Sequence, residues 1–127
     1  MAGKPAYRLG DLQLRIMKIL WKSGPTTVAE VHRELGTDQL AYATVATMLR
    51  KMEGRGLVGH REEDRRFIYA PAVCAEDVTR SAVDDLVDRM FEGRLADVVN
   101  HLLENRHVSR QELAQLERMI RERKKRR

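Results

Sequence analysis

The fold of this chain is decided by residues 41–71, which read AYATVATMLRKMEGRGLVGHREEDRRFIYAP. Their first part places apolar residues at i, i+3, i+4 and i+7 from Val45, the spacing of one buried helix stripe. Two apolar and aromatic runs follow, at residues 57–58 and 67–69, and the polar stretch 61–66 separates them, which predicts a β-hairpin. A helix followed by a hairpin with arginines near its tip is typical of a winged helix.

The helix face opposite the apolar stripe carries small and cationic side chains. They are Ala43, Ala46, Thr47 and Arg50, with Lys51 beside them. Small side chains let a helix enter the DNA major groove closely, where an arginine pairs with guanine and a methyl group contacts thymine. We therefore predict that this helix reads bases. An ordinary solvated helix face is the alternative.

The predicted hairpin tip carries Arg65 and Arg66. Guanidinium groups at such a tip can reach phosphates or the minor groove. Three acidic residues in the same stretch, Glu62, Glu63 and Asp64, oppose a purely electrostatic account. A charged, solvated loop without a binding role is the alternative.

The distribution of charge favours binding to phosphates by the first half of the chain. Residues 1–72 hold 12 Lys and Arg against 8 Asp and Glu, whereas residues 73–127 hold 12 against 11. The whole chain has a formal net charge of +5. Excess positive charge thus lies on the half with the predicted reading helix, which is permissive for nucleic acid. We predict two domains, which comprise residues 1–72 and residues 73–127.

Two further helices are expected before the reading helix. The first should begin at Asp11, an N-cap type of residue, and end before a Ser-Gly-Pro turn. The second should begin with a capping box formed by Thr27 and Glu30 and end at Gly36. A turn at residues 37–40 would then complete a helix-turn-helix.

Beyond the hairpin, the pattern is helical only. Apolar faces run along residues 78–91, 95–103 and 113–120, the last after a second capping box at Ser109 and Glu112. Three such helices cannot bury their faces alone, so we expect a twofold dimer, which would also present two reading helices to an inverted repeat. The expected dimerisation residues are Val83, Leu86, Val87, Met90, Leu95, Val99, Leu102, Leu113, Leu116 and Ile120.

No motif for catalysis, a cofactor or a metal is present. The four histidines lack metalloprotease spacing, and neither a nucleophile elbow nor a glycine-rich phosphate loop occurs. Cys74 is the only cysteine, so a disulfide or thiolate cluster within one chain is excluded. A redox role is the alternative to the favoured interpretation, in which Cys74 is a small buried or half-buried thiol.

The sequence also predicts a reduced cytoplasmic setting. A single cysteine fits that setting. The first residues lack the apolar segment of a secretory signal, and no apolar run approaches membrane-spanning length. We therefore expect a soluble protein without membrane insertion.

In their order, several segments resemble the bacterial penicillinase repressor family, which includes regulators of β-lactamase and methicillin resistance. The likeness covers about Leu9 to Glu122. Trp21, the pair Thr44 and Thr47, and Tyr69 match its pattern. The carrying segments are LQLRIMKILWKSGPTTVAEVHREL, AYATVATMLRKMEGRGLV, RRFIYAP, GRLADVVNHLLE and VSRQELAQLERMI.

This resemblance implies a dimeric transcriptional repressor, not an enzyme, with a winged helix-turn-helix on a short palindromic operator and a C-terminal helical dimerisation region. Ala43 and Ala46 depart from the family pattern, where longer basic side chains are expected, so the operator sequence should differ. From the resemblance, the helix face and the hairpin tip together, the expected DNA-binding residues are Tyr42, Ala43, Thr44, Thr47, Arg50, Lys51, Arg65 and Arg66.

The resemblance also implies that an inducing signal releases the DNA. Resistance regulators of the family are inactivated by a protease that cuts between asparagine and phenylalanine in the dimerisation region, and the matching positions here are His101 and Leu102. Copper-responsive relatives carry a cysteine-rich tail, which Cys74 alone cannot supply. The sequence therefore does not identify the inducer.

The alternative function is a winged-helix module that binds protein, with the helical tail as a docking element and without sequence-specific DNA recognition. Salt distinguishes the two, because binding through phosphates weakens steeply as salt rises. The terminal run RERKKRR is interpreted as a solvated cationic helix end, with nonspecific DNA affinity as its alternative.

Overall fold

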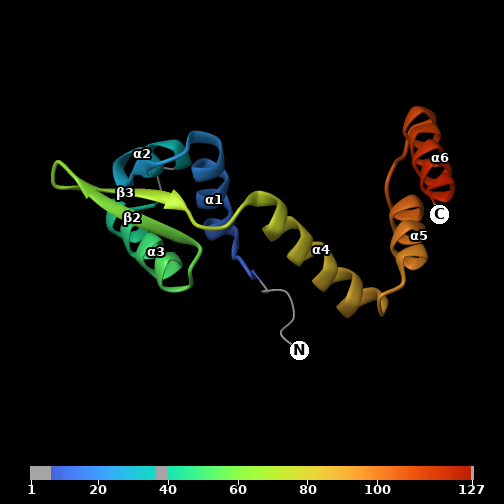
Figure 1. Cartoon of the computed structure of the whole chain (residues 1–127), viewed down its shortest axis with the longest axis horizontal. Helices are drawn as coiled ribbons and strands as arrows, with labels where there is room; N and C mark the ends of the chain where they lie inside the picture. Colours follow the sequence, from blue (N-terminus) through green and yellow to red (C-terminus); the bar gives the residue numbers. More distant parts are fainter. Residues whose placement is uncertain (1–6, 37–39, 127) are drawn as a thin grey trace. The chain divides into compact units, whose positions relative to one another are not determined.

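The computed structural model describes residues 7–36 and 40–126, which form six helices and three strands (Figure 1). They form two compact units, Met1–Asp85 and Leu86–Arg127, and α4 crosses the boundary. The limits predicted from the sequence, 1–72 and 73–127, differ from this division and stay a prediction. The elements are α1 (Asp11–Ser23), β1 (Thr26–Thr27), α2 (Val28–Leu35), α3 (Tyr42–Gly54), β2 (Val58–Glu63), β3 (Arg66–Pro71), α4 (Ala75–Phe91), α5 (Leu95–Asn105) and α6 (Arg110–Lys125).

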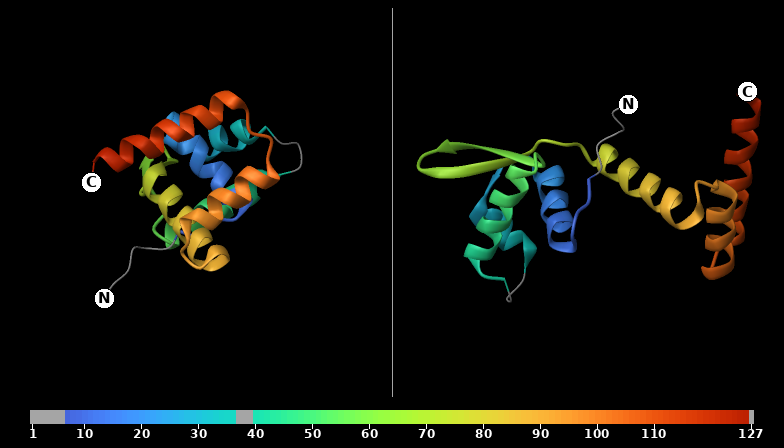
Figure 2. Two further views of the ribbon diagram at one scale, coloured as in Figure 1. Left: turned by 90° about the vertical axis from the view of Figure 1, so that its right-hand side faces the viewer. Right: turned by 90° about the horizontal axis from the view of Figure 1, so that it is seen from below.

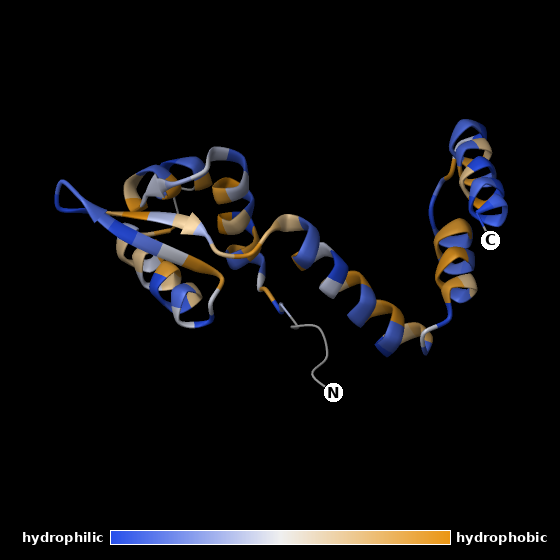
Figure 3. Cartoon of the chain, viewed as in Figure 1, coloured by the Kyte–Doolittle hydropathy of each residue, from blue (hydrophilic) through white to orange (hydrophobic). Residues whose placement is uncertain are grey.

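The first unit has the predicted mainly helical fold with a small β-hairpin wing. Its core holds the apolar stripe of α3, since Val45, Leu49 and Met52 are fully buried and Met48 is half-buried. Hydrophobic and hydrophilic residues alternate around α1 and α3, as expected for helices with one buried face (Figure 3). The whole cluster comprises Ile16, Met17, Leu20, Val28, Val31, Leu35, Val45, Leu49, Met52, Leu57, Val58 and Tyr69.

The start of α1 differs by one residue from the prediction. Asp11 is the first residue of the helix, and Gly10 is its N-cap. The Gly10 N–H donates to the Gln13 side chain at 3.2 Å. Asp11 still lies where its charge favours the positive end of the helix dipole.

The predicted capping box of α2 is confirmed. The Glu30 N–H donates to the Thr27 hydroxyl at 3.2 Å, and the Thr27 N–H donates to the Glu30 carboxylate at 3.2 Å. Gly36 ends the helix in the left-handed region, with φ 61°. The predicted turn that follows falls mostly on residues 37–39, which lie outside the described residues.

The same capping box makes α2 sensitive to acid. The backbone N–H and hydroxyl of Thr27 donate to Glu30 and hold the pKa of its carboxyl below the ordinary value. A pKa that is lowered by folding adds stability that is fully present above the ordinary carboxyl pKa. This stability is lost as the pH falls through the lowered pKa, because protonation removes the acceptor.

The hairpin is longer than predicted, and a third strand joins it. Residues 61–63 and Arg66 belong to β2 and β3, and only Asp64 and Arg65 form the turn. Polar side chains do not prevent strand pairing, because the ladder uses backbone groups and one face is solvated. β1, which was not predicted, pairs antiparallel with β3, so the sheet order is β1-β3-β2. Figure 2 shows the hairpin extending beyond α2 and α3.

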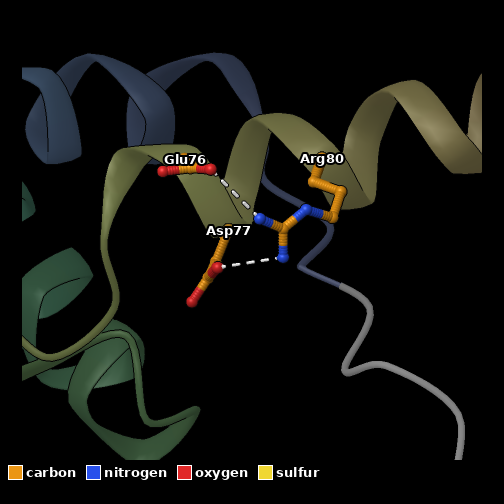
Figure 4. A network of polar contacts seen from close by, with 3 residues as sticks. All are labelled: Glu76, Asp77 and Arg80. Carbon is orange, nitrogen blue, oxygen red and sulfur yellow. Dashed lines mark hydrogen bonds and ion pairs between the residues drawn. The ribbon is translucent and has the colours of Figure 1, made fainter. Parts of the chain in front are cut away.

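The three C-terminal helices leave most of their apolar side chains exposed. Among the described residues of α4, α5 and α6, only Val78 is buried. At the start of α4, Arg80 forms ion pairs with Glu76 at 3.2 Å and Asp77 at 3.4 Å (Figure 4). Ser109 caps α6 by accepting from the Glu112 N–H at 3.1 Å. These local polar contacts are exposed and add little stability, so most of the apolar faces of the three helices lack a buried partner within the described chain.

The environment of Cys74 corrects the sequence-based interpretation. Its side chain is exposed, not buried or half-buried. It directly precedes α4 and lies outside the hydrophobic cluster of the first unit. No helix in the described part of the chain is long and apolar enough to cross a membrane.

Replacing the α2 cap should destabilise the first unit. We expect Thr27→Ala to lower the free energy of unfolding by about 1 kcal/mol, because the α2 amide loses its acceptor. Trp21 is the only tryptophan and lies on α1, so its fluorescence during urea unfolding reports on this unit. The control Thr79→Ala, at an exposed position on α4, should change the value by less than about 0.5 kcal/mol. Equal effects of both substitutions would contradict a stabilising role for the cap.

Candidate nucleic-acid interface

The outward face of α3 is presented because its opposite stripe is buried. Thr47 and Arg50 are both exposed, and the Arg50 guanidinium donates to the Thr47 hydroxyl at 3.1 Å. This bond holds the long side chain along the helix surface and reduces the rotamer freedom it must lose on binding. The remaining predicted contact residues of α3 are also exposed. They are Tyr42, Ala43, Thr44 and Lys51.

Ala46 occupies a different position from the rest of that face. It is half-buried and packs against the core, although the sequence placed it with the outward residues. A methyl group here lets α3 approach the hairpin without steric conflict. A longer side chain would have to extend into the space between them.

A groove of about 340 Å³ lies between α3, the start of α2 and the hairpin. It brings Arg50 from the helix together with Arg65 and Arg66 from the hairpin, so residues predicted separately surround one concavity. Ala43, Thr44, Thr47 and Lys51 are not part of its lining. The lining residues are Thr27, Val28, Ala29, Tyr42, Ala46, Arg50, Arg65, Arg66, Phe67 and Tyr69.

Sequence reasoning missed part of this groove. Thr27 was recognised only as a helix cap, and the two groove residues that follow it, Val28 and Ala29, were not predicted to belong to an interface. Phe67 was assigned only to a strand, yet its ring is 42% exposed at the groove. The exposed aromatic ring on a polar hairpin was the available signal, because a large apolar side chain seldom gains stability by facing water.

The cations at the groove are free to meet an anion. In the described part of the chain, no carboxylate lies within ion-pair distance of Arg50, Lys51, Arg65 or Arg66. Of the acidic residues that seemed to oppose them, Glu63 pairs with Arg61 at 3.0 Å. The hairpin therefore neutralises part of its own negative charge and leaves the tip arginines unpaired.

The backbone at the hairpin tip forms a tight turn. Asp64 and Arg65 adopt φ values of 50° and 63°, as two-residue hairpin turns require. Glycine adopts this conformation readily, whereas a long side chain is disfavoured there. The turn therefore holds the Arg65 backbone in the left-handed region at an exposed tip.

His60 connects the hairpin to the end of α3. Its Nδ1 lies 2.7 Å from the Glu53 carboxylate, and its ring centroid is 4.4 Å from Phe67 and 5.3 Å from Tyr69. Burial raises the pKa of the Tyr69 phenol above its ordinary value. The contact between His60 and Glu53 joins the hairpin to α3, whereas both ring contacts lie within the hairpin, between β2 and β3.

The arrangement suits an extended polyanion better than a reaction. Cations occur on two elements, and a groove that is also lined by aromatic side chains lies between them. In residues 7–36 and 40–126, no three His, Cys, Asp or Glu side chains are placed to hold a metal ion. A helix with exposed threonines and an arginine can contact base edges while the hairpin contacts phosphates.

Comparison with known proteins agrees with this geometry. The model of the penicillinase repressor family matches residues 9–122. The penicillinase repressor of Bacillus licheniformis is 30% identical over 124 residues, which cover 97% of this chain and 97% of that protein.

Two solved structures are similar to the first part of the chain. One is the solution structure of the DNA-binding domain of the repressor BlaI, with a TM-score of 0.51 and 32% identity. The other is Bacillus licheniformis BlaI in its monomeric form in complex with the blaP half-operator, with a TM-score of 0.50 and 32% identity. Each similarity covers 59% of this chain and 93% of the other.

Proposed function

The chain belongs to the penicillinase repressor family, and we propose that it is a transcriptional repressor that binds a specific DNA sequence. The observation that carries this proposal is the groove that joins Arg50 of α3 to Arg65 and Arg66 of the wing. A relative with 32% identity over the matched region is solved on half of an operator, which supports DNA as the occupant. The family is one of repressors, and we propose no catalytic activity. A regulator of this kind acts in the cytoplasm, where bacterial DNA lies.

The two parts of the interface have different roles in this proposal. α3 enters the major groove with Ala43, Thr44 and Thr47 against base edges, because small side chains allow close approach. Arg50 reads a base, and the arginines of the wing contact phosphates beside it. Base contacts provide the choice of sequence, whereas phosphate contacts provide affinity that falls with salt.

We further propose that the repressor acts as a homodimer through α4, α5 and α6. Eight of the ten predicted dimerisation residues are exposed, and Val87 and Leu116 are half-buried. Met90 is 67% exposed and Leu95 is 68% exposed. Contact of such apolar side chains with water is unfavourable, and a second copy that covers them lowers the free energy of the assembly. A twofold dimer then places two α3 helices on a pseudo-palindromic operator.

Selection of bound duplexes from random DNA tests the proposed function. At low salt, the full-length chain should enrich duplexes that carry one inverted repeat, because two identical reading helices recognise the same half-site in opposite directions. The measurement is sequencing of the bound pool after successive rounds. A pool without an enriched repeat would remove sequence-specific repression and leave the protein-binding module as the function.

Substitutions should separate base reading from phosphate contact. On the recovered repeat, Arg50→Ala should cost about 1–3 kcal/mol of binding free energy, and on random duplex much less. Arg66→Ala should weaken both duplexes alike and reduce the salt slope by about one. Lys18→Ala is the control, since Lys18 is an exposed cation on α1 outside the groove. Equal losses on both duplexes for Arg50→Ala would reassign it to phosphate.

Removing the helical tail should separate folding from tight binding. A fragment of residues 1–85 should be a monomer with native Trp21 fluorescence, and it should bind the full repeat about 10²- to 10⁴-fold more weakly than the whole chain. The reason is effective concentration, because a dimer with one half-site occupied holds its second α3 beside the other. In the full chain, Leu102→Asp should likewise favour the monomer and weaken binding to the full repeat. Sedimentation and DNA titration measure both, and a monomeric full-length chain would contradict the dimer.

A further inference from the structure

Residues 7–10, here called the N-terminal strap, contact the middle of α4. The Tyr7 N–H donates to the Ser81 hydroxyl at 3.0 Å. The Arg8 guanidinium lies 3.7 Å from the Asp85 carboxylate. Ser81 and Asp85 are one helical turn apart, so both contacts lie on one side of α4. The strap therefore contacts α4 at two successive helical turns.

The other side of the strap is attached to the end of the reading helix. Arg55, which directly follows α3, donates to the Arg8 carbonyl at 2.6 Å and to the Gln13 side chain at 2.9 Å. Gln13 in turn accepts from the Gly10 N–H. One short segment thus connects α3 to the middle of α4.

Neighbouring contacts restrict the same region. The Trp21 indole N–H donates to the Val73 carbonyl at 2.9 Å, just before α4 begins. Val78, in the first turns of α4, is buried. Tyr7 and Val73 pack against the core. α4 is therefore held from the strap, from α1 and from the core.

We propose that the strap determines which spacing between operator half-sites the repressor accepts. It does so by fixing the direction in which α4 leaves the winged helix. This inference rests on the proposed function as a dimeric repressor. It assigns the roles of positioning residues to Arg8, Ser81 and Asp85.

The length of α4 makes spacing sensitive to these contacts. α4 is a continuous helix of 17 residues. At 1.5 Å per residue it is about 26 Å long, so a tilt of roughly 8° at its base moves its far end by about 3.4 Å, the rise of one base pair. An added base pair also rotates one half-site by about 35° about the DNA axis, so accepting it requires a change of twist as well as tilt at the base of α4.

The contacts suit a geometric role better than an energetic one. The side chains of Arg8 and Asp85 are 69% and 39% exposed, and exposed ion pairs add little stability. Loss of the strap should therefore leave the winged helix folded and each α3 able to bind. What changes is the range of directions that α4 samples.

The test uses the full-length chain with Ser81→Ala and Asp85→Asn combined. Its DNA probes are the inverted repeat recovered by selection, the same repeat with its centre one base pair longer or shorter, and a single half-repeat. Wild type should bind the recovered spacing more tightly than the altered spacings. In the variant, this ratio of affinities should be about three- to tenfold smaller, as expected for residues coupled through a shared element. Affinity for the half-repeat should stay unchanged.

Two further variants distinguish the strap from a general effect of charge. Asp84→Asn removes the neighbouring exposed carboxylate, which forms no contact with the strap among the described residues, and should keep the wild-type preference. Arg8→Asp should lose the preference, and combination with Asp85→Arg should restore it, because the ion pair is rebuilt with reversed polarity.

The outcomes separate this inference from the proposed function. Failure to recover any repeat overturns the repressor itself, before a variant is made. A double variant with wild-type spacing preference overturns the strap alone. An equal loss of affinity for the half-repeat and for all full repeats also overturns it, since the strap would then act on α3 and not on spacing. Relaxed spacing with unchanged half-repeat affinity supports it.

Discussion

Burial of one stripe of α3 is the constraint on which the rest of the molecule depends. Val45, Leu49 and Met52 are completely shielded from water, and each contributes roughly 1.5–3 kcal/mol relative to exposure. Rotation of α3 about its axis would expose these side chains and is therefore prevented. Because side-chain directions around a helix are linked, the same burial fixes Thr47 and Arg50 outward. The stability of the unit and the orientation of its interface thus have one cause.

Local patterns explain why much of the fold was predictable. The capping box at Thr27 and the apolar stripe of α3 each lie within a few residues, and both were confirmed. β1 was not predicted because its two residues have no periodicity and its pairing with Tyr69 is remote in sequence. The strand character of residues 61–63 was missed because charged side chains resemble a loop, although strand pairing depends on backbone groups.

The candidate site was predictable to the extent that one helix carries it. The outward face of α3 follows from its buried stripe, so spacing identified its exposed residues but also wrongly placed the half-buried Ala46 among them. The groove was not predictable, because Arg50 and Phe67 meet only through the tertiary packing of helix against hairpin. Nor was the link between Glu53 and His60, whose atoms approach to 2.7 Å from two different elements. Sequence patterns within one element do not encode such distances.

The small strand β1 has a consequence for the order of folding. Thr26 and Thr27 pair with β3 only after the segment between the two strands has folded and brought them together. Closing so long a loop is slower than forming a helix. The helices can therefore form early, while the sheet that supports the wing is completed late. During synthesis, a chain lacking β3 has α3 but no groove. The groove is thus a late product of folding, because Phe67 and Tyr69 of β3 form part of its lining.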